Sequence, residues 1–323
     1  MKIESLLQWA FEYLKANLKF DINNYEKIVE TSYSVVYKIT TNQETLYLKQ
    51  TPKSLFLEPK TLTYFNKQTC QNIPKIIAEN KILNCFLMTS CGEESLRHLF
   101  KRKVDLNLLN LGISNYTKIQ RTLESKLPQL LALGIPDWRL EKFPSLFFKL
   151  IEQKELLIND GLSEKEINQL NESYKTCVNL CEVLSQYQLP ETINHCDFHE
   201  NNMLLNKTTN EISIIDWGET VISHPFFSLN GCLWNITYFN EVKQDDKIYK
   251  ELQRQCITPW LELYNEQQLL ESLTITNQLN GIFAALSYER IYNATMDQTR
   301  TVQQDHPGSI AGCLRSFLNH LSH

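Results

Sequence analysis

Residues 193–221 read INHCDFHENNMLLNKTTNEISIIDWGETV, and this stretch breaks the helical pattern that surrounds it. Apolar runs at Met203–Leu205 and Ile212–Ile215, with a polar turn between them, predict a small β-hairpin. A loop rich in reactive side chains leads into the first strand, and an aspartate follows the second. Because paired strands bring these positions to one end of the hairpin, we expect three side chains to meet there: Asp197, Asn202 and Asp216.

Two carboxylates and an amide at one point suit phosphoryl transfer. That reaction needs oxygen ligands that hold Mg²⁺ on the phosphates, and a carboxylate that receives the proton of the acceptor hydroxyl. Mg²⁺ prefers hard oxygen ligands of this kind. The stretch therefore predicts an enzyme that uses ATP and Mg²⁺, with Asp197 as the base and Asn202 and Asp216 as the metal ligands.

The first ninety residues predict a helix followed by a small antiparallel sheet with one inserted helix. Apolar positions at helical spacing make residues 1–20 an amphipathic helix. β-Branched and aromatic residues, broken by a polar turn, then predict a hairpin. The expected strands are Ser34–Thr40, Thr45–Gln50, Ile73–Ala78 and Lys81–Thr89, with Glu79-Asn80 as the turn between the last two and a helix at Leu57–Gln68.

From Ser95 onward, apolar residues recur three and four positions apart, which predicts helices. Gly161 closes one of them, and Ser163 with Glu166 forms a capping box at the start of the next. The expected helices are Leu96–Lys103, Tyr116–Leu131, Pro144–Asn159, Ser163–Gln186, Tyr249–Leu263, Glu266–Asn293 and Ser309–Leu321.

The catalytic stretch resembles the aminoglycoside phosphotransferase and choline kinase family, whose members are relatives of the protein kinases. That family has the pattern H-x-D-x-x-x-x-N, then an apolar strand pair, then an Asp that Trp usually follows. His195, Asp197, Asn202, Asp216 and Trp217 occupy these places, so the resemblance adds His195 to the catalytic set. Two further stretches resemble bacterial members, LGIPDWRLEKFPSL at Leu133–Leu146 and GETVISHPFFSL at Gly218–Leu229.

The resemblance covers residues 28 to 235 and implies an α+β, protein-kinase-like bilobal fold. A small antiparallel-sheet N-terminal lobe would bind the nucleotide, and a large, mainly helical C-terminal lobe would carry the catalytic loop and the acceptor site. We place the lobes at residues 1–91 and 92–323. The implied activity is transfer of the γ-phosphate of ATP to a hydroxyl of a small molecule that is aminoglycoside-, choline- or sugar-like.

The same resemblance implies residues that bind the nucleotide. Lys49, at the end of the second hairpin strand, matches the lysine that reaches the α- and β-phosphates, and Glu58 would be its acidic partner. The strand-to-hinge segment that binds adenine corresponds to Phe86–Gly92, with contacts expected from Met88, Ser90 and Cys91. A plain buried strand that ends in a turn would account for this segment equally well.

Two positions depart from the family pattern. The turn over the phosphates usually carries glycine, whereas here it reads ETSYS at residues 30–34. The hydroxyls of Ser32 and Ser34 would replace the glycine N–H contacts, and this departure puts the nucleotide affinity in question. Ser228 stands where relatives often have an Asp that supports the catalytic loop.

Other chemistry fits the same residues less well. His195, Asp197 and His199 alternate along an extended segment and could be transition-metal ligands, but this leaves Asn202 and the Asp-Trp pair unexplained. A nucleophilic site based on Cys196 lacks a G-x-S-x-G turn or an equivalent arrangement. The nine cysteines contain no C-x-x-C pair, so we expect reduced and mostly buried thiols rather than a zinc site.

Two other functions remain open. A nucleotide-binding pseudokinase that acts as a scaffold would account for the missing glycines, although the base, both metal ligands and the lysine are present. A kinase for protein Ser/Thr would keep the fold, but the helical insert at 100–190 favours a walled pocket for a small molecule.

Composition limits the partners. A formal net charge of −5 argues against a nucleic-acid partner, which normally faces a basic surface. The sequence has no run of 18 or more apolar residues and no signal-peptide pattern, so we expect a cytoplasmic protein without a membrane partner. The acceptor itself is not predicted. Candidate residues at the mouth of its pocket are Glu200, Glu219, Trp138, Tyr288 and Glu289.

Overall fold

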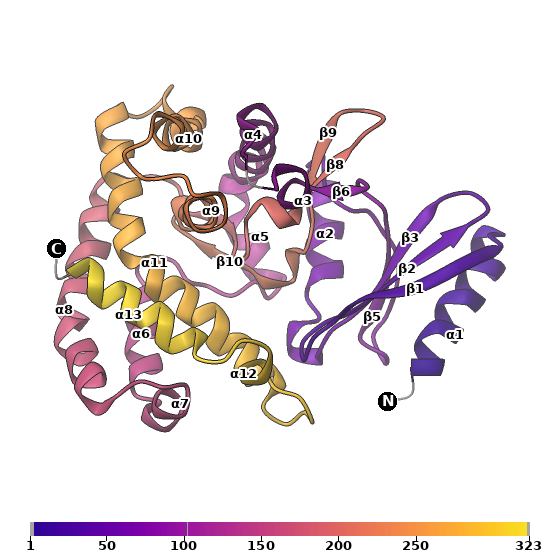
Figure 1. The fold of residues 1–323 in the computed structure, drawn as a ribbon, viewed down its shortest axis with the longest axis horizontal. Coiled ribbons are helices and arrows are strands. Elements are labelled where there is room, and N and C mark those ends of the chain that lie inside the picture. The colour runs from indigo at the N-terminus through magenta and orange to yellow at the C-terminus, as the bar shows by residue number, and fades with distance from the viewer. Residues whose placement is uncertain (1–2, 102, 322–323) are drawn as a thin grey trace.

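The computed structural model describes residues 3–101 and 103–321. An antiparallel sheet forms the N-terminal part and a group of helices forms the C-terminal part, which confirms the predicted α+β class (Figure 1). The sheet has the strand order β1-β2-β3-β5-β4. Its elements are α1 (Ile3–Tyr13), β1 (Ile22–Glu30), β2 (Val35–Thr41), β3 (Thr45–Gln50), α2 (Glu58–Lys67), β4 (Ile76–Asn80) and β5 (Cys85–Thr89). The division at residues 91 and 92 stays a prediction.

Helix α1 covers the outer face of the sheet. Leu6, Ala10 and Leu14 pack with buried side chains of β2, β3 and β5, among them Ile39 and Leu48. Strand β1 was not predicted, and eight of its nine residues are exposed. The predicted turn at Glu79-Asn80 is also wrong, because both residues belong to β4. The Asn80 side chain accepts hydrogen bonds from the N–H groups of Ile82 and Leu83, so the chain turns after Asn80.

The C-terminal part is helical, as predicted, with different boundaries. Its helices are α3 (Leu96–Phe100), α4 (Leu106–Leu123), α5 (Leu127–Ala132), α6 (Phe143–Ile151), α7 (Lys154–Asn159), α8 (Glu164–Gln186), α9 (Phe226–Asn240), α10 (Lys247–Ile257), α11 (Glu266–Thr295), α12 (Val302–Asp305) and α13 (Ser309–Leu321). The predicted helix Leu96–Lys103 contains Arg102, which lies outside the described residues, as do residues 1–2 of the predicted opening helix. Across the described residues, no helix is both long and apolar enough to cross a membrane.

Three predicted helix boundaries need correction. The predicted helix Tyr116–Leu131 is in fact two helices, α4 and α5, with a 3₁₀ turn at Glu124–Lys126 between them and a proline in the first turn of α5. The prediction Pro144–Asn159 likewise divides into α6 and α7. The prediction Tyr249–Leu263 ends as α10 at Ile257, followed by a 3₁₀ turn that contains a proline. The capping box of Ser163 and Glu166 at the start of α8 is confirmed.

Short strands are embedded among these helices, as the stretch at 193–221 predicted. Strand β8 (Met203–Asn206) pairs with β9 (Glu211–Ile214), and its other edge pairs with β6 (Glu94–Ser95). Strand β7 (Thr192–His195) pairs with β10 (Thr220–Ser223), so that His195 lies opposite Thr220. Because β7 precedes the catalytic loop and β10 follows Asp216, this pairing ties together the two ends of the segment that carries the predicted site.

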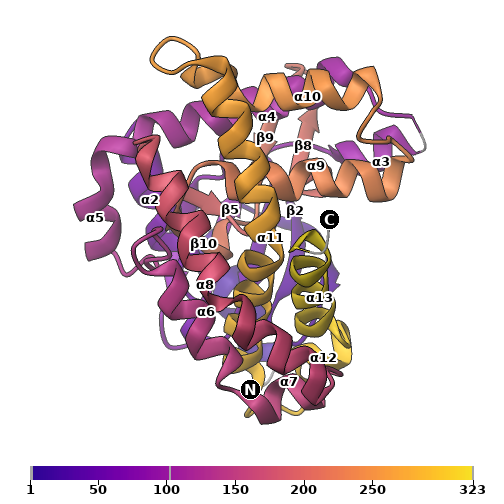
Figure 2. The same cartoon turned by 90° about the vertical axis from the view of Figure 1, so that its left-hand side faces the viewer.

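The helices α11 and α13 cross at close contact, and they lie side by side in both views (Figures 1 and 2). Gly281 permits this approach, because a Cβ atom at that position would lie 2.4 Å from the carbonyl oxygen of Cys313 and 2.7 Å from the backbone nitrogen of Phe317. The connection between the two helices, residues 296–308, contains α12.

All nine cysteines are free, and six of them are buried.

Candidate active site

Lys49 joins the N-terminal sheet to the embedded hairpin. Its Nζ donates to Glu58 Oε2 at 2.6 Å and to Asp216 Oδ1 at 2.5 Å. The structure therefore brings together the predicted lysine, its predicted acidic partner on α2 and a predicted metal ligand. Burial alone would lower the pKa of Lys49, but Asp216 and Glu58 outweigh it and raise the pKa well above its usual value. Lys49 is consequently a permanent buried cation.

Trp217 and Gly218 shape the surroundings of this ion pair. The second carboxylate oxygen of Glu58 accepts the backbone N–H of Trp217 at 2.9 Å, so Glu58 also fixes the chain just after Asp216. A Cβ atom at position 218 would lie 3.4 Å from Glu58 Oε2 and 3.9 Å from Lys49 Nζ. Asp216 has a left-handed backbone conformation, with φ 66° and ψ 55°, which turns its carboxylate out of the strand direction.

Asn202 and Asp197 meet across the catalytic loop. The Asn202 side-chain nitrogen donates to both the backbone oxygen and Oδ2 of Asp197, each at 2.9 Å. Because the amide nitrogen is used in this way, the amide oxygen is the atom that Asn202 can offer to a cation. The Asp197 side chain is 53% exposed and that of Asp216 is 46% exposed, so solvent and ligands can reach both carboxylates.

His195 is buried and forms hydrogen bonds at both ring nitrogens. Its Nδ1 accepts the backbone N–H of Asp197 at 3.1 Å, so its Nε2 carries the proton and donates to the carbonyl oxygen of Ile215 at 2.8 Å. Burial lowers the pKa of His195, which keeps the ring neutral. The ring thus connects the backbone of the proposed base to the residue before Asp216, and it acts as a positioning residue.

His199 contacts the proposed base directly. Its Nδ1 accepts the N–H of Asn201, and its Nε2 lies 2.9 Å from Asp197 Oδ1. Desolvation alone would raise the pKa of Asp197, but His199 and the other hydrogen-bonding groups outweigh it and hold the pKa at about 2. Asp197 is therefore ionised at neutral pH. Both histidine rings are engaged inside the loop, which argues against their use as transition-metal ligands.

Ser228 supports the catalytic strand by an arrangement that the sequence did not predict. Both its backbone N–H and its hydroxyl donate to Asn194 Oδ1, at 3.1 and 2.9 Å, and both residues are buried. The Tyr116 hydroxyl accepts the N–H of His195 at 3.0 Å. An Asn on β7 and a Ser on α9 together anchor the strand that leads into the loop.

The phosphate turn was predicted at residues 30–34; Glu30 ends β1, and Thr31–Ser34 connect it to β2. The Thr31 hydroxyl accepts the N–H groups of Tyr33 and Ser34, at 3.3 and 3.0 Å. Burial raises the pKa of Tyr33, and the charges of Glu219, Asp197 and Asp216 raise it further. The sequence missed Thr31 and Tyr33, whose roles depend on the folded turn.

The predicted adenine-binding residues lie at the end of β5. Met88 pairs with Tyr47 of β3, and the strand ends at Thr89, one residue before Ser90. Burial raises the pKa of the Cys91 thiol to about 11, so this thiol is neutral at physiological pH. Contact of Met88, Ser90 and Cys91 with adenine stays a prediction.

The residues predicted to bind the acceptor do not all lie in one pocket. Glu219 accepts a hydrogen bond from the Ser287 hydroxyl at 2.7 Å, and burial together with the charge of Asp197 raises its pKa to about 7. Trp138 and Glu289 line a pocket of about 360 Å³. Glu200 is wrong as a residue of the mouth, because it is fully buried and pairs with Arg97 at 2.7 Å.

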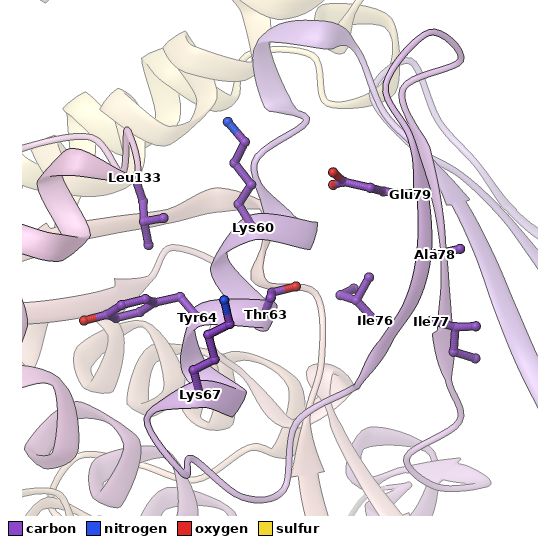
Figure 3. A pocket seen from close by; sticks show the side chains of 9 residues that line it. All are labelled: Lys60, Thr63, Tyr64, Lys67, Ile76, Ile77, Ala78, Glu79 and Leu133. Atoms are coloured by element: carbon purple, nitrogen blue, oxygen red, sulfur yellow. The ribbon is translucent and has the colours of Figure 1, made fainter.

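A further pocket lies outside this set of residues. It has a volume of about 420 Å³ and lies between α2 and β4 (Figure 3). Its lining side chains are Lys60, Thr63, Tyr64, Lys67, Ile76, Ile77, Ala78, Glu79 and Leu133, none of which was predicted as a site residue.

Residues 27–258 match the model of a family described as the phosphotransferase enzyme family. This match spans most of the chain, and the chain belongs to that family. The resemblance found in the catalytic stretch is therefore confirmed. No match was found among curated protein sequences.

Solved structures share the fold. The ethanolamine kinase of Plasmodium vivax aligns with a TM-score of 0.65 and 13% identity, over 99% of this chain and 89% of its own. The GDP complex of aminoglycoside 2′-phosphotransferase-IIIa aligns with a TM-score of 0.63 and 15% identity, over 98% of both chains. An aminoglycoside phosphotransferase from Streptomyces rimosus, in complex with ADP and streptomycin, aligns with a TM-score of 0.51 and 12% identity, over 84% of this chain and 98% of its own.

Proposed function

We propose that the chain transfers the γ-phosphate of ATP, with Mg²⁺, to a hydroxyl of a small molecule. The observation that carries this proposal is the position of Lys49 between Glu58 and Asp216. A buried lysine held by two carboxylates at the junction of sheet and hairpin is placed to contact the phosphates of a nucleotide. Family membership supports the same reaction class.

The residues present fit a magnesium ion. Asp216 offers a half-exposed carboxylate, and Asn202 offers its amide oxygen because its nitrogen is bonded to Asp197. These are the hard oxygen donors that Mg²⁺ selects, and Mg²⁺ usually completes its shell with water and phosphate oxygens. When bound, the ion neutralises charge on the phosphates.

Asp197 would orient the acceptor hydroxyl. With a pKa of about 2 it is ionised over the physiological range but is a weak base, so it accepts a hydrogen bond from the hydroxyl and takes the proton late in the transfer. The hydrogen bonds from His199 and Asn202 hold the carboxylate in one orientation. Positioning of this kind is the main contribution of protein groups to phosphoryl transfer.

The acceptor is proposed to be a small molecule. The solved structures that share the fold include enzymes whose names give ethanolamine or aminoglycosides as substrates, and this supports a hydroxyl compound of similar size. A pocket of about 360 Å³ lined by Trp138 and by Leu286 and Glu289 of α11 supports an acceptor of small size.

An ATP-consumption screen tests the proposed function. The purified chain is offered ATP·Mg²⁺ with a panel of amino alcohols, aminoglycosides and sugars, and ADP release is measured. We expect at least one compound to stimulate release, and Asp197→Asn to reduce this by about 10²- to 10⁴-fold while ATP still binds. A panel without any response, together with intact ATP binding, would favour the pseudokinase instead. Equal loss of turnover and ATP binding in Asp197→Asn would argue against its role as the base.

A further inference from the structure

The N–H groups of the phosphate turn are all engaged. Thr31 N–H donates to the carbonyl of Ser34 at 2.9 Å, and the Thr31 hydroxyl accepts those of Tyr33 and Ser34. Only the N–H of Ser32 is bonded outside the turn. In a kinase-like fold, backbone N–H groups of this turn are the groups that a phosphate can contact.

The partner of the Ser32 N–H is a carboxylate from the other end of the chain. Asp305, the last residue of α12, accepts this hydrogen bond through Oδ2 at 2.6 Å. Its side chain is only 4% exposed, and it also forms an ion pair with Arg300. Burial alone would raise the pKa of Asp305, but the contacts with Ser32 and Arg300 outweigh this and lower it. The Asp305 carboxylate thus accepts the hydrogen bond of the Ser32 N–H, the one N–H of the turn that is not bonded within the turn.

The next residue contacts the turn as well. The His306 Nε2 lies 3.1 Å from the Tyr33 hydroxyl, and the His306 ring also lies against Tyr288 of α11, with ring centroids 5.8 Å apart. Two successive residues, Asp305 and His306, therefore contact two successive residues of the turn. The contact joins the β1–β2 turn of the N-terminal sheet to the C-terminal helices.

The segment that carries these residues holds its own shape. Thr301 and Gln304 form a capping box around α12, and the N–H of Val302 donates to the Thr295 hydroxyl of α11 at 3.1 Å. We call residues 300–306 the clasp. Because the clasp is ordered by its own hydrogen bonds, Asp305 is presented to Ser32 in a fixed position.

We propose that Asp305 is a built-in competitor of the ATP phosphates and that the clasp must release the turn before a phosphate can contact the Ser32 N–H. One N–H cannot serve a carboxylate and a phosphate at once, and two anions at that place repel each other. The proposal rests on the proposed function, since it assumes that the turn receives the phosphates of ATP. A groove of about 900 Å³ borders the turn, and it is lined by Thr31–Val35, by Asn293 and Ala294 of α11, and by Asp297 and Gln298 of the connection that follows α11.

Equilibrium binding to the full chain tests this. Affinities for ATP·Mg²⁺ and for adenosine are measured by calorimetry for the wild type, for Asp305→Ala and for Asp305→Asn. The matched control is Asp245→Asn, which removes one negative charge from an exposed residue in the loop between α9 and α10. We expect Asp305→Ala to bind ATP about fivefold more tightly, the effect of one hydrogen bond that no longer competes. Adenosine affinity should stay constant in all variants, because adenosine has no phosphate.

Hydrogen exchange supplies a second readout. Addition of ATP·Mg²⁺ to the wild type should increase amide exchange in residues 300–306, whereas an ordinary bound ligand protects the segments near it. A thermal melt of each variant confirms that it is folded.

Each outcome decides the proposal. Tighter ATP binding by Asp305→Ala, with adenosine and the control unchanged, supports it, as does ATP binding that only the Asp305 variants show. Equal or weaker ATP binding by Asp305→Ala overturns the proposal and leaves the proposed function intact. If neither the wild type nor any variant binds ATP, the clasp proposal and the proposed function both fail.

Discussion

The ammonium group of Lys49 lies 2.6 Å from Glu58 and 2.5 Å from Asp216, which follow it in the chain by 9 and 167 positions. Breaking a buried ion pair by removal of one partner leaves an uncompensated charge, which is costly. Here the cation has two partners, so the loss of one moves Lys49 toward the other. We therefore expect a change at Glu58 to shift the position of the Lys49 ammonium group more than it lowers the free energy of unfolding.

Glu58→Gln tests this relationship. The amide keeps an oxygen for the Trp217 N–H but loses the charge that holds Lys49, so we expect ATP turnover to fall by about 10²-fold through misplacement of the lysine. Steady-state kinetics measure kcat and KM, and Glu251→Gln on the exposed side of α10 is the matched control. An unchanged kcat would show that Asp216 alone positions Lys49.

Asn194→Ala should destabilise the fold. It removes the oxygen that accepts both the N–H and the hydroxyl of Ser228 in a fully buried place, and we expect a loss of about 1 to 3 kcal/mol in the free energy of unfolding. Ser228→Ala removes only one of these bonds and should cost less. Urea denaturation of both single variants and the double variant gives the coupling between them, and additive effects would contradict a shared interaction.

Arg97→Met should leave the buried carboxylate of Glu200 without its partner. The expected loss is about 3 to 5 kcal/mol, the typical result of breaking a buried pair. In the double variant Arg97→Met/Glu200→Gln the buried charge is gone, so part of the stability should return. Denaturant unfolding measures all three variants, and a double variant that is no more stable than Arg97→Met would refute the pairing as the cause.

Glu219 should make stability depend on pH. Its folded-state pKa of about 7 exceeds the usual 4.5, so between these values the folded state keeps a proton that the unfolded chain has lost. The resulting stabilisation is complete below about pH 4.5 and disappears as the pH rises through 7. Glu219→Gln stays neutral throughout. We therefore expect its melting temperature, relative to the wild type, to be about 2 °C higher at pH 8 than at pH 5.

Thermal melts without nucleotide and divalent ions are the measurement for Glu219. The same pH comparison on Glu211→Gln, an exposed carboxylate at the start of β9, is the control. A difference between wild type and Glu219→Gln that does not change with pH would contradict the raised pKa.

Much of the architecture was predictable because strong local patterns agree with the tertiary structure. The hairpin at 193–221 and the helix α13 follow from their periodicity. Strand β1 was missed because it lies at the sheet edge with nearly all its side chains exposed, which removes the alternating pattern. Helix α9 was missed for a different reason, since its exposed positions include Trp234, Tyr238 and Phe239 and the helix therefore shows no polar stripe.

Some residues of the site could be predicted from the sequence, whereas their long-range partners could not. Asp197, Asn202 and Asp216 were predicted from the spacing of the embedded hairpin, and Lys49 from the family resemblance. The partner of Glu200 lies 103 positions earlier, on a helix of five residues, and that of Ser32 lies 273 positions later. Contacts over such separations leave no periodic or spacing signal in one sequence, and only the folded chain shows them.

Gly281 lies where α11 and α13 cross. Gly281 permits the short distance between α11 and α13, because a side chain there would meet the backbone of α13. Residues 296–308 connect these two helices, so their position depends on that distance. A methyl group added at Gly281 would meet the backbone of α13, so we expect it to shift α13 and the segment that carries Asp305. If Asp305 competes with ATP as proposed, substitutions at this helix crossing should change ATP affinity without contact with the nucleotide.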